Sequence, residues 1–236
     1  MSFKESSEAV FSESPGKIAF RKLKKDKRSL VALTILFSVI VLSFAAPIYA
    51  KYIAHTDPFK SNLNGTISIN GKDVQLLQPS TTGLGLGVTP IGPTWNPTKY
   101  FLGSDSQGRD VAARLLYGGR STLIIGTSAG LLCVLLSLLI GIFAGYRRGW
   151  LDSVLSRLLD IIWAFPVYLL AISLSVVLLT SGLSFGFIHF GPGSFALPIF
   201  IIGIVYIPYV ARPIRAQVLA LREREFVRAA IGTGAK

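Results

Sequence analysis

Three long stretches without a charged residue constrain this chain more than any other feature of its sequence. Asp, Glu, Lys and Arg are all absent from residues 29–50, 121–146 and 161–211. A helix needs about 20 predominantly apolar residues to cross the hydrocarbon core of a bilayer, so the first two stretches each have the length of one crossing. The third is long enough for two crossings and carries glycines and a proline near its middle, where a turn is favoured. We therefore predict four transmembrane helices, over residues 29–50, 121–146, 158–179 and 195–212.

The composition agrees with an all-α integral membrane protein. Hydrophobic residues make up 51% of the 236 residues and charged residues only 15%, whereas a typical soluble domain has about 25% charged residues. The mean hydropathy of +0.56 excludes an intrinsically disordered chain, which needs low hydrophobicity. The single cysteine, Cys133, excludes a disulfide scaffold and a multi-cysteine metal cluster.

The basic residues predict how these helices are oriented. Residues 1–30 carry eight of the 24 Lys and Arg residues, residues 147–157 carry three and residues 212–236 carry six, whereas the loop between the third and fourth helices carries none. Lys and Arg accumulate in the cytoplasmic loops of membrane proteins. We therefore expect the N-terminus, the turn at 147–157 and the C-terminus to lie on the cytoplasmic side of a prokaryotic inner membrane. The net charge of +12 then reflects this bias and contact with anionic lipid, and does not indicate nucleic-acid binding.

The same pattern divides the chain into four parts. Residues 1–28 form a basic cytoplasmic segment, 29–50 the first transmembrane helix, 51–118 a long extracytoplasmic loop and 119–236 a helical transmembrane domain. Within the first part, apolar residues are interleaved with the basic residues of 17–28, which predicts a helix. Two interpretations of this helix remain open: it lies on the inner surface of the membrane, or it is a solvated run of charge that only sets the topology.

The extracytoplasmic loop contains one strong turn signal, Asn70-Gly71, between two short segments that could form strands. Asn-Gly favours a two-residue turn between antiparallel strands, so residues 66–75 should form a β-hairpin in which Ile67 faces Val74. Two strands alone are only marginally stable in water, so the hairpin should pack on the ends of the helices or on a partner protein. The glycine- and proline-rich residues that follow are expected to form an irregular connection.

No catalytic or metal-binding pattern is present in the sequence. It lacks the G-x-x-x-x-G-K-[ST] loop that holds ATP phosphates, so the chain is not expected to bind ATP itself. His55 and His189 are isolated, which argues against a zinc site or histidine-based catalysis. Asp160 follows Arg157 by three positions at the start of the third predicted helix, where such a pair is favourable, and we interpret both residues as structural. We therefore predict that the chain is not an enzyme and carries no metal or other cofactor of its own.

The C-terminal segment, residues 219–236, has the composition of a surface that packs closely on a partner. Residues 222–230 predict a short charged helix that ends at the glycines after it, since glycine readily adopts the left-handed conformation of a helix end. Ala229, Ala230 and Gly234 form a small-residue patch among Arg and Glu. Such a patch lets a partner groove approach closely while the charges pair at its rim. The alternative is a solvated helix beside the membrane.

Phe226 lies among charged residues on the same predicted helix. An aromatic residue in this setting can anchor an interface by filling a pocket of a partner, as aromatic hot-spot residues do. The other interpretation of Phe226 is that it packs back onto the ends of the chain's own helices.

This segment resembles the E-A-A-x-x-x-G loop of ABC importer permeases, here R-A-A-I-G-T-G over residues 228–234, with Arg in place of Glu. Its form R-E-F-V-x-A-A-x-x-x-G-A is typical of dipeptide and oligopeptide permeases. A second block, residues 102–120, is similar to the signature L-G-[TS]-D-x-x-G-R-D and R-L-[LI]-Y-G-x-R that precedes the second helix of the C-type subunit of that family. A third block of similarity runs over residues 144–166.

The resemblance implies the type I ABC importer permease fold, in which residues 219–236 form the coupling segment that docks on an ATPase. It implies three kinds of protein partner: a second permease subunit, two ABC ATPase subunits that bind ATP and Mg²⁺, and an extracytoplasmic substrate-binding protein. Membrane lipid is the further partner that the apolar stretches and basic residues predict. The implied substrates are di- or oligopeptides, although relatives carry nickel, glutathione or sugars. The residues implied at the ATPase contact are Arg222, Glu223, Glu225, Phe226, Arg228, Ala229, Ala230 and Gly234. The residues of the signature before the second helix, expected to be structural, are Gly103, Asp105, Gly108, Arg109 and Asp110.

The sequence departs from the family pattern in two places. Ile231-Gly232-Thr233 replaces the usual R-A-L of the coupling segment, which adds flexibility there. The pattern also continues beyond Lys236 and includes two further transmembrane helices, for a total of six, so we expect the natural chain to be longer.

Other interpretations remain open at this point. Residues 51–99 match no part of the family pattern, and they either help to dock the binding protein or pack as a lid on the permease helices. A secondary transporter or channel subunit is the main alternative function. It is expected to show intramembrane charges, or broken helices at corresponding positions in two halves, and the sequence indicates neither. A membrane-anchored adaptor is a third interpretation.

Overall fold

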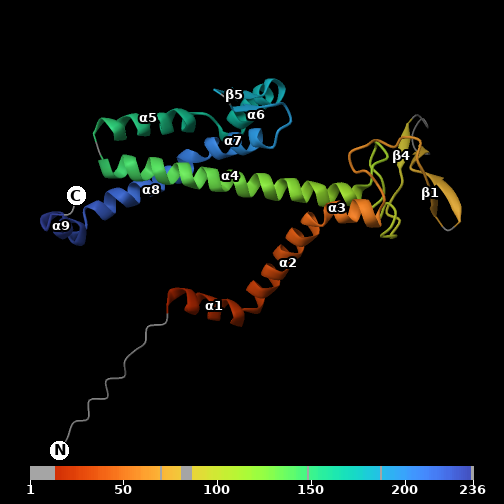
Figure 1. Cartoon of the computed structure of the whole chain (residues 1–236), viewed down its shortest axis with the longest axis horizontal. Coiled ribbons are helices and arrows are strands. Elements are labelled where there is room, and N and C mark those ends of the chain that lie inside the picture. The colour runs from red at the N-terminus through yellow and green to blue at the C-terminus, as the bar shows by residue number, and fades with distance from the viewer. Residues whose placement is uncertain (1–13, 70, 81–86, 148, 187, 235–236) are drawn as a thin grey trace, which may run out of the picture. The chain divides into compact units, whose positions relative to one another are not determined.

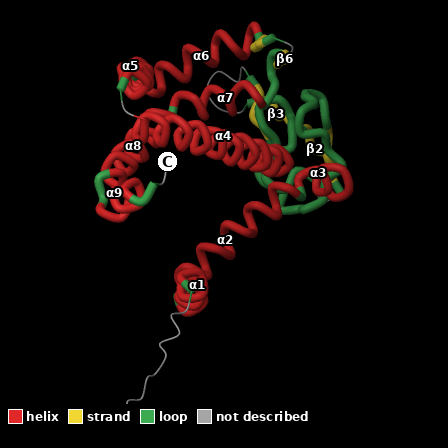
Figure 2. Tube along the Cα trace, turned by 60° about the vertical axis from the view of Figure 1, so that its left-hand side comes forward, coloured by secondary structure: helices red, strands yellow, loops and turns green. Residues whose placement is uncertain are grey.

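The structure, a computed structural model of the whole chain, describes residues 14–69, 71–80, 87–147, 149–186 and 188–234 (Figures 1 and 2). The chain divides into two compact units, Met1–Arg120 and Ser121–Lys236. The long helix α4 (Val111–Arg147) begins in the first unit and ends in the second. Helices dominate the described residues, and the strands form three two-stranded sheets. The mainly helical membrane fold predicted from the sequence is therefore confirmed.

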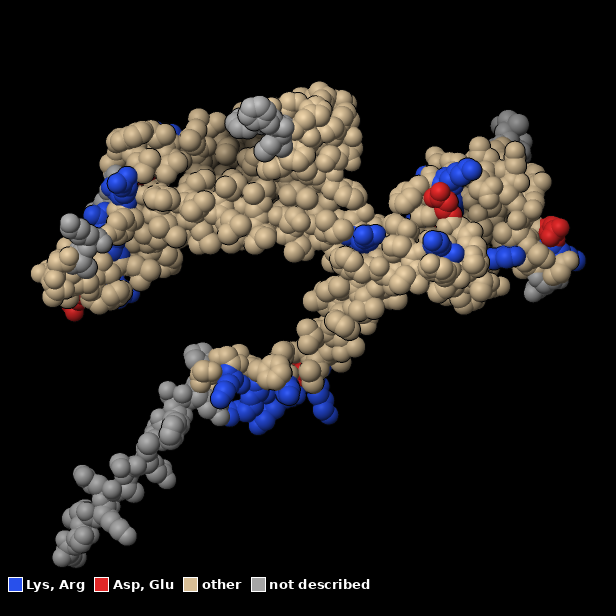
Figure 3. All heavy atoms as spheres, in the orientation of Figure 1, with Lys and Arg blue, Asp and Glu red and all other residues tan. Residues whose placement is uncertain are grey.

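Two helices begin the described part of the first unit. α1 (Pro15–Lys25) is joined to α2 (Lys27–Phe44) through Asp26, whose backbone is extended at φ −90° and ψ 104°. The Asp26 carboxylate accepts hydrogen bonds from the backbone N–H of Arg28 at 3.1 Å and from the hydroxyl of Ser29 at 2.5 Å, so it caps α2. The single helix predicted up to Arg28 is therefore two helices. Lys and Arg side chains gather on one side of α1 (Figure 3).

The first predicted transmembrane helix ends before Ala50. α2 ends at Phe44, and the chain continues into the short helix α3 (Ala46–Ile48) and the π-helical turn η1 (Tyr49–Ile53). Pro47 lies in α3 and has no backbone N–H, so the hydrogen-bond ladder of α2 cannot continue through it.

The extramembrane loop, residues 54–110, begins its regular structure with a small antiparallel sheet. β1 (Thr66–Ile69) pairs with β2 (Lys72–Gln75), and Ile67 lies opposite Val74. This pairing confirms the predicted hairpin and its register, while Asn70 of the predicted turn lies outside the described residues.

A second small sheet follows in the same loop. β3 (Leu77–Pro79) pairs with β4 (Val88–Pro90), so part of the connection predicted to be irregular is a sheet. The side chains on which the first hairpin packs come from the loop itself. They form one buried hydrophobic cluster made of Ile67, Leu76, Ile91 and Tyr100.

The second unit contains the C-terminal part of α4 followed by further helices and one short sheet. In chain order these elements are α5 (Trp150–Ala164), α6 (Val167–Ser181), β5 (Leu183–Phe185), β6 (Ile188–Phe190), α7 (Ala196–Val205), α8 (Ile207–Arg222) and α9 (Glu225–Gly232). The pairing of β5 with β6 was not predicted, because the glycines of this region were interpreted only as helix breakers.

Among the described residues, α2 and α4 have the length and composition of membrane spans, and there are up to four spans if each of two bent helix pairs counts as one. α5 and α6 meet at 88°, and α7 and α8 meet at 44°. The single span predicted over 158–179 therefore corresponds to part of the bent pair of α5 and α6. Phe165 is extended at φ −92° and ψ 138°, because the residue before a proline avoids the helical region and Pro166 has no N–H to donate.

Within the second unit, α7 and α8 pack on α4 at residues without large side chains (Figures 1 and 2). A Cβ built on Gly141 would lie 2.7 Å from Cγ2 of Ile214 on α8, and a Cβ on Gly145 would lie 2.8 Å from Cβ of Val218. One turn before them, the buried Ser137 hydroxyl donates a 3.2 Å hydrogen bond to a backbone carbonyl of α8. Small residues permit this close approach of helices in membranes.

Candidate functional site

The motif predicted before the second transmembrane helix forms a tight turn held by one carboxylate. Asp105 accepts hydrogen bonds from the backbone N–H groups of Gln107 at 2.8 Å and Arg109 at 3.0 Å, and from Nε of Arg109 at 2.8 Å. The Arg114 guanidinium lies 3.5 Å from the same carboxylate. Burial alone would raise the pKa of Asp105, but the hydrogen bonds from Arg109 and Gln107 outweigh it and hold that pKa below its usual value.

Asp110 ties the beginning of α4 to the chain that follows η1. Its side chain is fully buried, and Oδ1 accepts hydrogen bonds from the backbone N–H groups of Ala112 at 2.9 Å and Ala113 at 3.2 Å. The hydroxyl of Thr56 donates to Oδ2 at 3.2 Å. Asp110 is therefore the N-cap of α4, and it satisfies donors that a helix leaves without partners in its first turn.

The two glycines of the motif lie where no side chain fits. Gly103 has a φ of +84° and Gly108 a φ of +71°, a region that other residues rarely adopt. A Cβ on Gly103 would meet the carbonyl oxygen of Ile91, and a Cβ on Gly108 would meet the carbonyl oxygen of Asn62. The Gly108 carbonyl also accepts a 3.1 Å hydrogen bond from the hydroxyl of Tyr100. Both glycines therefore allow two stretches of loop backbone to touch.

Gly108→Ala should loosen the extramembrane loop, because the new Cβ would be strained by its positive φ and would collide with a backbone carbonyl. The strain alone costs about 1–3 kcal/mol, and the collision adds to it. Gly71→Ala is the matched control, since Gly71 has a φ of +77° but open space where a Cβ would lie. Hydrogen–deuterium exchange over residues 62–76 should accelerate clearly more in Gly108→Ala than in the control, and equal acceleration would contradict the close contact.

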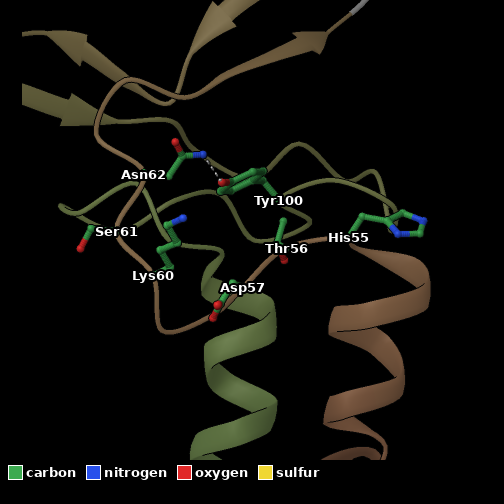
Figure 4. A pocket seen from close by; sticks show the side chains of 7 residues that line it. All are labelled: His55, Thr56, Asp57, Lys60, Ser61, Asn62 and Tyr100. Carbon is green, nitrogen blue, oxygen red and sulfur yellow. Dashed lines mark hydrogen bonds between the residues drawn. The ribbon is translucent and has the colours of Figure 1, made fainter.

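A small polar pocket lies in the same loop (Figure 4). It has a volume of about 270 Å³ and is lined by His55, Thr56, Asp57, Lys60, Ser61, Asn62 and Tyr100. Asn62 donates a 3.4 Å hydrogen bond to the Tyr100 hydroxyl, and burial raises the pKa of Tyr100. This volume is slightly below the range of about 300–1,000 Å³ in which small-molecule sites fall. We interpret the pocket as part of the packing of the loop rather than as a ligand site.

Two ion pairs join α5 to α8 in the second unit. Nε and Nη2 of Arg215 donate to the two oxygens of Asp152 at 2.6 and 2.7 Å, and Nη2 of Arg212 donates to Asp160 at 2.5 Å. We call these four residues the α5–α8 ion pairs. Leu159 is buried between the two helices, against residues of α8. A bidentate arginine–carboxylate contact fixes geometry as well as charge, so α5 is held in a defined position on α8.

The predicted partner of Asp160 was wrong. Asp160 pairs with Arg212, whereas Arg157, three residues before it, is exposed. The guanidinium of Arg212 also lies 4.1 Å from the centre of the Trp163 ring, and that ring stacks on Tyr209 with their centres 4.6 Å apart. The interhelical partner is favoured because the cation–π contact adds to the charge attraction.

The coupling segment contains two helices rather than the single helix predicted from Arg222 onward. α8 ends at Arg222, the helix breaks at Glu223, and α9 begins at Glu225. Nη1 of Arg222 donates to the backbone carbonyl of Tyr146 at 2.6 Å. Nη2 of Arg228 donates to Glu223 across the break at 2.6 Å. The first contact joins the end of α8 to α4, and the second joins α9 to Glu223, the residue that follows α8.

α9 presents an exposed aromatic side chain on the same side as two alanines. Phe226 is 66% exposed, and Ala229 and Ala230 are exposed as well. Residues three and four apart share one side of a helix, so these three form one surface, which we call the docking face. Gly234, just after α9, is also exposed and has a φ of +97°. The helices that the structure describes therefore do not cover Phe226.

Two family comparisons match parts of this chain to transport proteins. Residues 137–236 match the family of the binding-protein-dependent transport system inner membrane component, and residues 14–68 match the N-terminal transmembrane domain of oligopeptide transport permease C. These two stretches include α1, α2, the docking face and the α5–α8 ion pairs.

Individual relatives agree with these family matches. The chain is 32% identical over 224 residues to the dipeptide transport system permease protein DppC of Alkalihalophilus pseudofirmus, which covers 94% of this chain and 59% of that protein. It is 28% identical over 222 residues to the oligopeptide transport system permease protein OppC of Bacillus subtilis, with 93% and 58% covered. It is 33% identical over 136 residues to the glutathione transport system permease protein GsiD of Pectobacterium atrosepticum, with 58% and 41% covered.

The chain spans about three fifths of the length of the dipeptide and oligopeptide permeases that it matches. The two family matches include the N-terminal transmembrane region, the block at residues 144–166 and the coupling segment, whereas the signature at residues 102–120 lies between them. The chain belongs to the family of the binding-protein-dependent transport system inner membrane component.

Proposed function

We propose that this chain is a permease subunit of an ATP-driven ABC importer that moves peptides across the cytoplasmic membrane. The family matches and the similarity to peptide permeases over most of the chain support this proposal. A second permease subunit, two ATPase subunits and an external substrate-binding protein complete the transporter. ATP and Mg²⁺ bind to the ATPase subunits, because the sequence of this chain has no phosphate-binding loop.

Di- or oligopeptides are the favoured substrates. The relatives named for dipeptide and oligopeptide transport match 94% and 93% of this chain, whereas the relative named for glutathione transport matches 58% of it. Glutathione is itself a tripeptide of unusual linkage, and it is the second candidate substrate.

The observation that carries the coupling role is the exposed docking face of α9. This face combines the exposed aromatic side chain of Phe226 with the small side chains of Ala229 and Ala230. Small side chains let a partner approach the helix closely. Buried aromatic residues are typical anchors of protein interfaces, and Phe226 is not buried by the residues that the structure describes in this chain. We infer that a pocket of an ATPase subunit receives it, and that movement of the ATPase reaches the membrane helices through α8.

The distribution of Lys and Arg supports a cytoplasmic N-terminus and a cytoplasmic α9. In this orientation the extramembrane loop faces the side from which a binding protein delivers its substrate. A surface for docking the binding protein and a lid over the permease helices are both compatible with this location.

Phe226→Ala and Gly234→Trp should each weaken the association of the ATPase with the complete transporter. Removal of a buried aromatic anchor costs about 2 kcal/mol or more, which is roughly a 30-fold loss of affinity. The tryptophan should prevent close approach at the end of α9. The measurement is co-purification of the ATPase with the tagged complete permease, followed by uptake of a labelled dipeptide, and of labelled glutathione, into proteoliposomes that contain the binding protein and ATP.

Two variants provide the controls. Phe59→Ala removes an aromatic side chain that is similarly exposed, at 68%, from the extramembrane loop, and it should leave ATPase association unchanged. Gly234→Ala reproduces the backbone strain at the positive φ without the bulk, and it should retain the ATPase. If Gly234→Trp keeps its ATPase and transports at the parental rate, the coupling role of α9 is wrong.

A further inference from the structure

The helix α1 has a mainly apolar side and a mainly basic side, and Ile18 lies among the basic residues. In a helix each residue is turned by about 100° from the one before, so Ala19, Phe20 and Leu23 share one side, while the basic residues occupy the opposite arc. These basic residues are Lys17, Arg21, Lys22, Lys24 and Lys25, and α1 contains no acidic residue. A segregated pattern of this kind is typical of helices that lie in the interface of a membrane.

The apolar side of α1 has no cover within the described chain. Phe20 is 59% exposed, Leu23 is 36% exposed and Ala19 is exposed as well. The ammonium of Lys24 lies 4.7 Å from the centre of the Phe20 ring, so a charged group stands at the border of the apolar side. Lysine side chains at such a border can bury their methylene stems and extend the charge toward polar surroundings.

The connection between α1 and α2 fixes where this side lies. α2, a candidate membrane span, begins at Lys27, two residues after α1 ends. The two helices meet at the extended residue Asp26, so the axis of α1 does not continue the axis of α2. In Figure 3 the Lys and Arg side chains of α1 lie on the side away from the course of α2, and the other side chains lie on the side toward it. The apolar side therefore faces the layer that α2 crosses.

We propose that α1 binds the anionic phospholipid surface of the membrane, with Ala19, Phe20 and Leu23 in the acyl boundary and its Lys and Arg residues on lipid phosphates. This interaction is independent of the coupling role of α9. Each basic residue near an anionic leaflet strengthens binding by roughly fivefold, so the five on α1 give it a strong preference for anionic lipid. The consequence is that the entry point of α2 is held at the level of the headgroups.

The depth of α1 can be measured with spin labels on single cysteines in the complete protein with Cys133→Ala, reconstituted in vesicles. Ala19→Cys lies on the apolar side and Lys17→Cys on the basic side. In phosphatidylcholine vesicles with a quarter phosphatidylglycerol, the label at 19 should be accessible to oxygen and protected from a water-soluble nickel chelate. The label at 17 should show the reverse. In pure phosphatidylcholine, or at high salt, a free population of the label at 19 should appear, because the charge attraction is lost or screened.

Neutralising three lysines tests the role of charge. Lys17, Lys24 and Lys25 changed together to Gln should shift the equilibrium between immersed and free α1 by roughly 100-fold toward the free state in the anionic vesicles. The matched control changes three exposed lysines of the extramembrane loop, Lys60, Lys72 and Lys99, to Gln and should leave the equilibrium unchanged.

Two outcomes would overturn the proposal. Equal accessibility of the labels at 19 and 17 to the nickel chelate would show that α1 is a solvated helix. Protection of the label at 19 that appears only after the ATPase subunits are added, and does not depend on phosphatidylglycerol, would show that a protein covers this side.

Discussion

Gly141→Leu should remove most of the folded permease from the membrane. A Cβ at this position would lie 2.7 Å from Cγ2 of Ile214 and 3.0 Å from the carbonyl oxygen of Ala211. The carbonyl belongs to the backbone of α8 and cannot move away as a side chain can. Overpacking of this kind costs about 1–3 kcal/mol for small additions, and the four carbons of leucine should exceed that range. The effect is measured as a lower unfolding temperature of the purified protein in detergent, with the loss of monodisperse protein on heating as the readout.

Gly130→Leu is the control for this substitution on the same helix. No atom lies within 4 Å of a Cβ built on Gly130, and its surface is exposed. The change adds the same side chain to the same transmembrane helix and removes the same glycine from it, so any general effect of leucine on α4 appears in both variants. Equal unfolding temperatures for the two variants would show that α4 and α8 are not in the close contact described.

Arg215→Ala should loosen the contact of α5 with α8 and impair transport even where the protein still assembles. The side chains of Arg215 and Asp152 are 32% and 18% exposed, so the remaining carboxylate would be left partly desolvated without its bidentate partner. Breaking a buried pair on one side costs about 3–5 kcal/mol, and the partial exposure of this pair reduces the expected loss to about 2–3 kcal/mol.

A double-mutant cycle isolates the pair from the other contacts of its members. Arg215→Ala and Asp152→Ala should together cost clearly less than the sum of their separate effects on unfolding, with a coupling energy of about 1–3 kcal/mol. The matched pair for stability is Arg228 with Glu223, whose side chains are 67% and 49% exposed. Exposed pairs contribute about 0–1 kcal/mol, so the same cycle there should give little coupling. A coupling energy near zero for Arg215 and Asp152 would mean that this ion pair does not help to hold α5 on α8.

The features predicted correctly from the sequence were those that depend on neighbouring residues. The hairpin of β1 and β2 was predicted with the correct register, because Asn-Gly fixes the turn and the register follows from it. The membrane helices α2 and α4 were predicted because the length of an apolar stretch is sufficient evidence. The break at Pro166 also had a local signal, but the length of the charge-free stretch outweighed it in the prediction.

The features that were missed depend on residues far apart in the chain. Asp160 was assigned to Arg157 because a partner three residues away is visible in one sequence, whereas Arg212 is 52 residues away. Asp152 and Arg215 were not predicted as a pair for the same reason. The break between α8 and α9 has no glycine or proline to mark it, and the contacts that accompany it, from Arg222 to Tyr146 and from Arg228 to Glu223, also depend on the fold.

The near-perpendicular bend at Pro166 changes what a rotation of α5 does. In a straight span, turning one half of the helix about its axis leaves the direction of the other half unchanged. Because α5 and α6 meet at 88°, a rotation of α5 about its own axis changes the direction of the α6 axis by nearly the same angle. The α5–α8 ion pairs lie on α5 at Asp152 and Asp160, about two turns apart, so they restrain rotation of α5 at two positions. The orientation of α6 in the bilayer therefore depends on side chains of α5 and α8 as well as on the contacts of α6 with α7.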